Sequence, residues 1–278
     1  MTTAGSRQYG QPQRSIAELI DLRGRAVAVA GGAGHIGRAM AHALAELGSD
    51  VALLDRPGLA APVAGDLAAQ HGMRCLAVDV DLAAPAEAAD AIDRVTDAFG
   101  RLDVLVHAAA LVGTSPIEGW AVPFADQRLG AWTQALDVNL TSAFALVQRA
   151  APALRQRAHG SVIFVGSIYG VVGPDWRLYE GMALGNPAAY AATKGALLQL
   201  VRWLSTTLAP DVRVNAISPG GVYRDTPEPF HSRYVERTPL RRMAVEEDFK
   251  GAVAFLASDL SAYVTGHNLM VDGGWTAW

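Results

Sequence analysis

Apolar, β-branched runs alternate with Ala- and Leu-rich stretches from about residue 25 to residue 272. The apolar runs are short and continuous, as strands are when helices cover both faces of a sheet. Regular β-α alternation predicts a doubly wound α/β fold, in which a seven-stranded parallel sheet is flanked by helices. The predicted strands are 25–30, 50–55, 73–80, 102–108, 160–167, 212–218 and 268–273, and the predicted helices are 36–48, 59–71, 85–99, 132–158, 189–209 and 246–257.

Composition restricts the possible partners. The chain has 278 residues, a formal net charge of −4 and no basic stretch, so we expect no nucleic-acid partner. Its one cysteine, Cys75, rules out an internal disulfide and a multi-cysteine metal site, which favours the cytoplasm and a protein without a metal. Because no run of about 18 apolar residues occurs, we expect no membrane association.

No break in composition marks a second domain. The polar residues 1–15 read as a flexible N-terminal arm, and residues 16–278 as a single domain.

A glycine cluster follows the first predicted strand. Glycines between a strand and a helix let backbone N–H groups and the helix dipole approach a pyrophosphate, which indicates a Rossmann-like dinucleotide site. The alternative interpretation is a plain strand-to-helix turn. The cofactor-binding candidates here are Gly31, Gly34, His35, Ile36 and Gly37.

Acidic residues end the next two predicted strands. Asp55 lies 55 − 31 = 24 residues after the first glycine, where a carboxylate can accept hydrogen bonds from the ribose 2′-OH and repel a 2′-phosphate. This favours NAD over NADP, although the neighbouring Arg56 could pair with a phosphate. Asp79 and Val80 are candidates for the adenine, with a turn-capping role as the alternative for Asp79.

Together with the motifs that follow, these features resemble the short-chain dehydrogenase/reductase family over residues 22–275. The family loop T-G-x-x-x-G-x-G appears here as "AGGAGHIG", and the family N-N-A-G appears as "HAAA" at 107–110. In the second motif a structural asparagine is missing. Ala108 and Ala109 still offer small side chains beside the path that the resemblance implies for the cofactor.

Four polar residues carry the resemblance into the chemistry. Asn139, Ser167, Tyr190 and Lys194 resemble the family's catalytic Asn-Ser-Tyr-Lys set, in which the tyrosine transfers a proton while a hydride moves at the nicotinamide. Near neutral pH a tyrosine can act as a base only if a cation stabilises its phenolate. Tyr190 and Lys194 are four residues apart and share a helical face. The resemblance also implies that Lys194 binds the nicotinamide ribose.

Two other tyrosines compete with Tyr190. Tyr179 lies 179 − 167 = 12 residues after Ser167, close to the interval usual in the family. Four residues after it stands Ala183, however, and Tyr169 has Gly173 at the same offset, so neither has a lysine partner. The pattern therefore predicts Tyr190 as the acid/base.

The segment between Ser167 and Tyr190 is longer than is usual in the family, and it predicts a substrate-selecting insertion. Its aromatic and charged composition suits a polyhydroxylated ligand, with a surface excursion as the alternative. The substrate-binding candidates are Ser167, Tyr169, Trp176, Arg177, Tyr179, Tyr190 and, further along, Arg224. The following "ISPGG" resembles the loop that contacts nicotinamide, which implies cofactor contacts for Pro219, Gly220 and Val222.

We therefore predict an NAD-dependent oxidoreductase that interconverts a secondary alcohol and a ketone on a small-molecule substrate. The pattern is similar to gluconate 5-dehydrogenase-like members, which favours a sugar, sugar acid or polyol. The alternatives are a reductase of 3-oxoacyl or other hydrophobic ketones, and a catalytically silent NAD(H)-binding regulator. The C-terminal segment resembles one that packs between subunits in the family, which implies a homotetramer.

Overall fold

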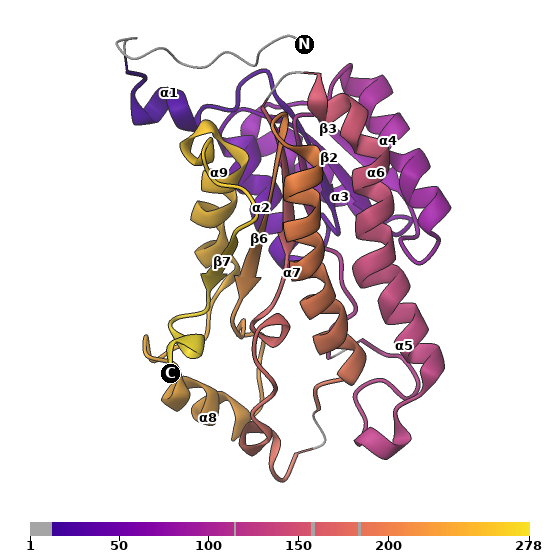
Figure 1. Cartoon of the computed structure of the whole chain (residues 1–278), viewed down its shortest axis with the longest axis vertical. Helices are drawn as coiled ribbons and strands as arrows, with labels where there is room; N and C mark the ends of the chain where they lie inside the picture. Colours follow the sequence, from indigo (N-terminus) through magenta and orange to yellow (C-terminus); the bar gives the residue numbers. More distant parts are fainter. Residues whose placement is uncertain (1–12, 114, 157–158, 183–184) are drawn as a thin grey trace.

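The computed structural model describes residues 13–113, 115–156, 159–182 and 185–278. Seven parallel strands form one sheet in the order β3-β2-β1-β4-β5-β6-β7 (Figure 1), which confirms the predicted fold class. The chain reverses its direction of winding between β1 and β4, as in a doubly wound sheet. The strands are β1 Ala26–Ala30, β2 Asp50–Asp55, β3 Cys75–Asp79, β4 Val104–His107, β5 Gly160–Val165, β6 Val212–Pro219 and β7 Asn268–Val271.

Helices cover both faces of this sheet, which explains the continuous hydrophobicity of its strands. In β1, Val27 and Val29 face the helices α2, α3 and α9, whereas Ala28 and Ala30 face α4, α6 and α7. Every residue of this strand is fully buried. The α-helices are α1 Ile16–Ile20, α2 His35–Glu46, α3 Ala60–His71, α4 Pro85–Phe99, α5 Leu129–Leu136, α6 Ser142–Arg155, α7 Ala188–Leu208, α8 Phe230–Arg237 and α9 Lys250–Ala257.

The helix predicted over 132–158 is divided. It starts earlier as α5, passes through a π-helical turn at Asp137–Thr141 and continues as α6. The structure also contains α1 and α8, which the periodicity did not predict. The 3₁₀ helices are Phe124–Asp126, Ile168–Gly170, Trp176–Tyr179, Glu246–Phe249, Asp259–Ser261 and Trp275–Ala277.

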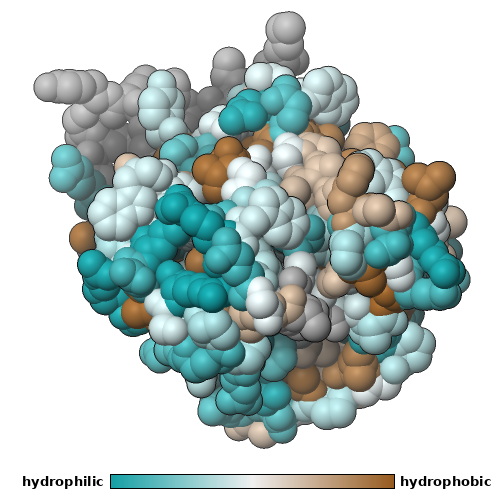
Figure 2. Space-filling model, turned by 90° about the horizontal axis from the view of Figure 1, so that it is seen from below, coloured by the Kyte–Doolittle hydropathy of each residue, from teal (hydrophilic) through white to brown (hydrophobic). Residues whose placement is uncertain are grey.

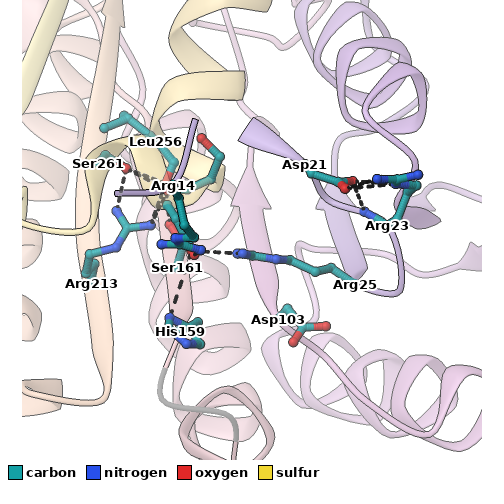
Figure 3. A network of polar contacts seen from close by, with 12 residues as sticks. Arg14, Asp21, Arg23, Arg25, Asp103, His159, Ser161, Arg213, Leu256 and Ser261 are labelled. Carbon is teal, nitrogen blue, oxygen red and sulfur yellow. Dashed lines mark hydrogen bonds and ion pairs between the residues drawn. The ribbon is translucent and has the colours of Figure 1, made fainter. Parts of the chain in front are cut away.

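Ion pairs tie the start of the described chain to the region after α9 (Figure 3). Arg14 and Arg25 both donate to the carboxylate of Asp259, at 2.7 and 2.8 Å. Burial alone would raise the pKa of Asp259, but hydrogen bonds from the two guanidinium groups outweigh it and lower that pKa. Nearby, Arg213 donates to Ser261 and to the carbonyl of Leu256. Residues 1–12, most of the predicted arm, lie outside the described residues.

The carboxyl ends of the strands meet at one end of the molecule, the lower end in Figure 1. At this end, the segment that follows β5 lies beside α8. Arg233 of α8 donates hydrogen bonds to the carbonyls of Leu178 and Glu180 in that segment. Within the described ranges, no helix is long and apolar enough to cross a bilayer.

Candidate active site

Of the cavities at the carboxyl edge of the sheet, where ligands of parallel α/β sheets bind, two are lined by residues of the glycine loop or of the predicted catalytic set. The larger has a volume of about 620 Å³ and lies beyond β1, β2 and β4. The smaller, about 200 Å³, lies beyond β5 and β6 and beside the segment 167–190. Figure 2 views the molecule from this end and shows a hollow between a hydrophilic side and a more hydrophobic side.

The glycine cluster forms one wall of the larger cavity. Gly34 is the N-cap of α2 and provides no side-chain cap, so the first N–H groups of this helix are left for a ligand. A Cβ on Gly37 would lie 2.1 Å from the carbonyl oxygen of Gly31, and a Cβ on Gly31 would lie 2.5 Å from the nitrogen of Ala109. The tight turn therefore requires these glycines, and its charge pattern suits a pyrophosphate.

Seven of the sixteen predicted cofactor residues line this cavity. They are Gly31, Gly34, Asp55, Arg56, Val80, Ala108 and Ala109. The carboxylate of Asp55 accepts hydrogen bonds from the N–H groups of Ala33 and Arg56, both at 2.9 Å, which joins the end of β2 to the glycine loop. Asp79 instead accepts a hydrogen bond from the N–H of Gly58 at 3.2 Å. It therefore caps a turn, and it does not line the cavity.

His35 and Ile36, the other predicted residues of the loop, begin α2. The His35 side chain is 70% exposed, and its Nδ1 lies 3.8 Å from a carboxylate oxygen of Glu246. Neither residue lines the larger cavity. His35 occupies the position of the second glycine in the family loop T-G-x-x-x-G-x-G. Its bulky side chain fits there because it points into solvent.

Tyr190 and Lys194 lie one turn apart on α7, next to Ser167 at the end of β5. The Lys194 side chain is buried; its Nζ lies 5.7 Å from the centre of the Tyr190 ring and donates to the carbonyl of Val165 at 2.7 Å. Burial lowers the pKa of Lys194 to about 8, so this side chain is protonated in most molecules at neutral pH. Burial raises the pKa of Tyr190, and hydrogen bonding to Ser167 opposes that rise. The structure thus brings a neutral phenol, a hydroxyl and a buried cation together.

Asn139 lies within the π-helical turn and is fully buried. Its Oδ1 accepts a hydrogen bond from the N–H of Leu111 at 2.7 Å, and its Nδ2 donates to Thr193 at 3.1 Å. Thr193 precedes Lys194 on α7. The Asn139 side chain therefore joins the loop after β4 to the helix that carries the lysine, and π-turns often occur at functional sites.

His107 ends β4 on the same side of the sheet as Lys194, and sequence reasoning did not assign it a role. Its Nε2 lies 3.0 Å from the hydroxyl of Ser142, which donates its proton to the carbonyl of Val138. Nε2 must therefore be the protonated nitrogen, which leaves Nδ1 as an acceptor, buried and without a partner among the described residues. Burial and the charge of Lys194 lower the pKa of His107 to about 3, so the ring is neutral.

The smaller cavity contains the predicted acid/base and part of the predicted insertion. Of the substrate candidates, Ser167, Tyr169, Tyr179 and Tyr190 line it. The hydroxyls of Tyr169 and Tyr179 lie 2.9 Å apart. Gly220 also lines the cavity; Pro219 ends β6, and Val222 makes a parallel bridge with Ala244.

The structure does not bring the other substrate candidates into this cavity. Arg177 pairs with Asp175 at 2.7 Å, and Trp176 is 58% exposed. Arg224 donates to Glu246 at 3.0 Å. Its charge still reaches the site, because it acts to lower the pKa of Tyr190.

The opposite wall comes from residues that sequence reasoning did not select. Phe230 and Tyr234, four residues apart on α8, line the cavity. The buried Asn186, which belongs to the predicted insertion, also lines it. The i, i+4 aromatic pair in "FHSRYVER" was the available signal for the first two. Only the folded chain places α8 against the insertion.

Comparison with known proteins agrees with this geometry. The family model described as enoyl-(acyl carrier protein) reductase matches residues 31–276. The chain belongs to the short-chain dehydrogenase/reductase family. Members of this family are NAD(P)-dependent oxidoreductases that act on CH–OH groups, and the predicted reaction class is confirmed.

Similar members differ in substrate. A sorbose reductase of Schizosaccharomyces pombe is 31% identical over 92% of this chain and 98% of its own. An L-rhamnose 1-dehydrogenase (NAD(P)+) of Sphingomonas is 34% identical over 91% and 96%. The structure of a gluconate 5-dehydrogenase from Burkholderia cenocepacia, in complex with NADP and tartrate, superposes with a TM-score of 0.84 at 27% identity, covering 94% of this chain and 99% of that one.

Proposed function

We propose that this short-chain dehydrogenase/reductase interconverts a secondary alcohol and a ketone on a sugar, sugar acid or polyol, with NAD as the cofactor and Tyr190 as the acid/base. The observation that carries the proposal is that Ser167 and Tyr190 line the smaller cavity together, with the buried Lys194 next to Tyr190. When bound, the cofactor supplies or accepts the hydride.

The residues of the chain handle the proton. A buried, neutral Tyr190 can donate its phenolic proton to the carbonyl oxygen during reduction, and it takes the proton back during oxidation. The ammonium of Lys194 stabilises the phenolate that is left. Ser167 donates to the reacting oxygen and orients it. Asn139 acts through the backbone, because its side chain is engaged by Leu111 and Thr193.

The choice of NAD rests on Asp55. Its carboxylate lines the larger cavity at the end of β2, where it would meet the ribose hydroxyls and repel a 2′-phosphate. Arg56 lines the same cavity and is exposed, so it provides the opposing preference for NADP. Gly34 and the start of α2 would hold the pyrophosphate.

The size of the smaller cavity supports a small polar substrate. Its 200 Å³ is below the roughly 300–1,000 Å³ of sites for drug-sized ligands, and tyrosines contribute to its lining. A long acyl chain would need more apolar room. We assign the protein to the cytoplasm, as a single domain that assembles into a homotetramer; exposed Trp132, Phe144 and Trp203 on α5, α6 and α7 support such contacts.

Tyr190→Phe tests the proposal. Turnover should fall roughly 10²–10⁴-fold, because the phenylalanine keeps the ring and removes the proton. Turnover is measured by absorbance of the reduced nicotinamide with sugars, sugar acids, polyols and 3-oxoacyl ketones. NADH binding, measured by fluorescence, should be unchanged. A variant that keeps a large share of the wild-type turnover would contradict the role of Tyr190.

A further inference from the structure

The smaller cavity has a mixed apolar and hydroxyl-bearing lining. Among the described residues, its lining contains no Asp, Glu, Lys or Arg. The lining residues are Val112, Gly113, Ser167, Ile168, Tyr169, Tyr179, Gly185, Asn186, Pro187, Tyr190, Gly220, Gly221, Phe230 and Tyr234. A ligand held here would therefore meet hydroxyl, amide and backbone groups and the faces of aromatic rings.

Tyr169, Tyr179 and Asn186 form a polar cluster in the wall of the cavity. Burial raises the pKa of both tyrosines, so both are neutral hydroxyls, and the neighbouring Asn186 amide opposes that rise in each. Two phenols carry two protons, and their mutual hydrogen bond uses one. The second proton has no acceptor among the described residues. It is available to a ligand oxygen in the cavity.

Tyr179 is also close enough to Tyr190 to raise its pKa. The cluster therefore lies beside the reacting centre. An alcohol group adjacent to the reacting carbon could accept the free phenolic proton and donate to a phenolic oxygen, which matches the donor and acceptor capacity of both partners.

The cations near the cavity already have partners. Arg224 is paired with Glu246, and Arg177 with Asp175. Lys194 is buried behind Tyr190 and donates to Val165. A carboxylate in the cavity would lose water without gaining an unpaired cation from the described residues, and a buried charge without a counter-charge is strongly unfavourable.

We propose that this site selects an uncharged polyhydroxylated substrate, a neutral sugar or polyol, over a sugar acid, and that Tyr169, Tyr179 and Asn186 recognise a hydroxyl beside the reacting carbon. The inference rests on the proposed function and narrows its substrate class. It separates this chain from the gluconate 5-dehydrogenase that it resembles in fold, whose substrate is an anion.

Matched substrates test the selection. With NAD+ and the wild-type enzyme, kcat/KM is compared for glucitol against gluconate and for galactitol against galactonate. The neutral member of each pair should be favoured by at least about 100-fold, the effect expected for a buried charge left unpaired. Equal or greater kcat/KM for the acids would overturn the proposal. If Arg224→Gln then lost this activity with the acids, Arg224 would be identified as the counter-ion of their carboxylate.

Substitutions test the cluster. Tyr179→Phe and Asn186→Leu should each lower kcat/KM for the preferred polyol about tenfold more than they lower kcat/KM for 2-butanol, the effect of one lost hydrogen bond. Tyr263→Phe is the matched control, because that side chain is fully exposed. Equal losses with the polyol and 2-butanol would mean that the cluster only shapes the site, which would overturn its assigned role.

A binding measurement separates this proposal from the proposed function. Calorimetry with Tyr190→Phe and NAD+ should show glucitol binding more tightly than gluconate, whether or not turnover occurs. Preferential glucitol binding by a wild-type enzyme that turns over no alcohol would contradict the function and keep the selectivity. Preferential gluconate binding would contradict the selectivity.

Discussion

The two cavities at the carboxyl edge of the sheet are built in different ways. The larger one combines glycines and alanines from the turns that follow β1 and β4 with larger side chains, such as Asp55 and Arg56, at and after the ends of β2 and β3. The smaller one is walled by tyrosines, an asparagine and a phenylalanine from the segment 167–190 and from α8. In its glycine turn the first achieves its shape by omitting side chains, and the second achieves its shape by burying polar ones. Substitutions in the two regions should therefore have opposite kinds of effect.

Lys194→Met gives the largest expected effect, because it removes a buried charge that the reaction needs. Turnover should fall by roughly 10²-fold or more. The folded protein binds this proton only up to about pH 8, whereas the unfolded chain binds it up to the ordinary lysine pKa of 10.5. The unfolded state holds more protons between these values, so the stability of the fold rises with pH there. Below pH 8 the buried charge of Lys194 destabilises the fold by its full amount.

The same variant should therefore be more stable at pH 7, by at most about 3 kcal/mol and less after loss of the Lys194–Val165 hydrogen bond. Urea unfolding at pH 7 and pH 10 measures the gain, which should shrink at the higher pH. A variant less stable than the wild type at pH 7 would show that the lysine stabilises the fold.

Gly37→Ala tests whether the larger cavity depends on the absence of a side chain in the glycine turn. Its Cβ would lie 2.1 Å from a backbone oxygen of Gly31, so the turn must shift, at a cost of about 2–3 kcal/mol in unfolding free energy. NADH affinity should fall by about tenfold or more, measured by fluorescence titration. Gly65→Ala in α3 is the control, because a Cβ there meets nothing within 4 Å and should stabilise the protein by about 1 kcal/mol.

His107→Asn sharpens the contrast by restoring the residue usual in the family. The folded protein protonates His107 only near pH 3, while the unfolded chain does so near pH 6.5. Between these values the unfolded state holds the extra proton, so acid destabilises the protein by about 1.4 kcal/mol per pH unit through this group. Unfolding between pH 6.5 and 4.5 should show a shallower pH slope in the variant. Parallel slopes would mean that the ring is charged in the folded state.

Asp55→Ala gives the smallest expected effect. Asp55 is the acidic residue among the predicted cofactor residues that line the larger cavity. Without the carboxylate, repulsion of a 2′-phosphate disappears and Arg56 remains, so the ratio of kcat/KM for NAD+ over NADP+ should fall about tenfold. Steady-state kinetics with both cofactors measure it. An unchanged ratio would remove Asp55 as the basis of the choice.

Local pattern accounts for much of the cofactor end. The seven strands, their parallel arrangement and the glycine turn could all be predicted because continuous apolar runs and strand-to-helix turns are set by residues close in sequence. The pairing of Tyr190 with Lys194 was equally accessible, since four residues make one helical turn. The division of the helix predicted over 132–158 could not be predicted from local sequence, because the π-turn at Asn139 depends on contacts with Leu111 and Thr193 from other elements.

The sequence by itself determined the class of fold, the place of the nucleotide loop and which tyrosine has a lysine partner. Only the tertiary structure decided which side chains of the insertion face the reacting centre: Tyr169 and Tyr179 do, whereas Arg177 is held away by Asp175. It also brought Phe230 and Tyr234 of α8 to the opposite wall. The physical reason is that direction and burial in an irregular segment depend on packing against distant residues, which no local periodicity records.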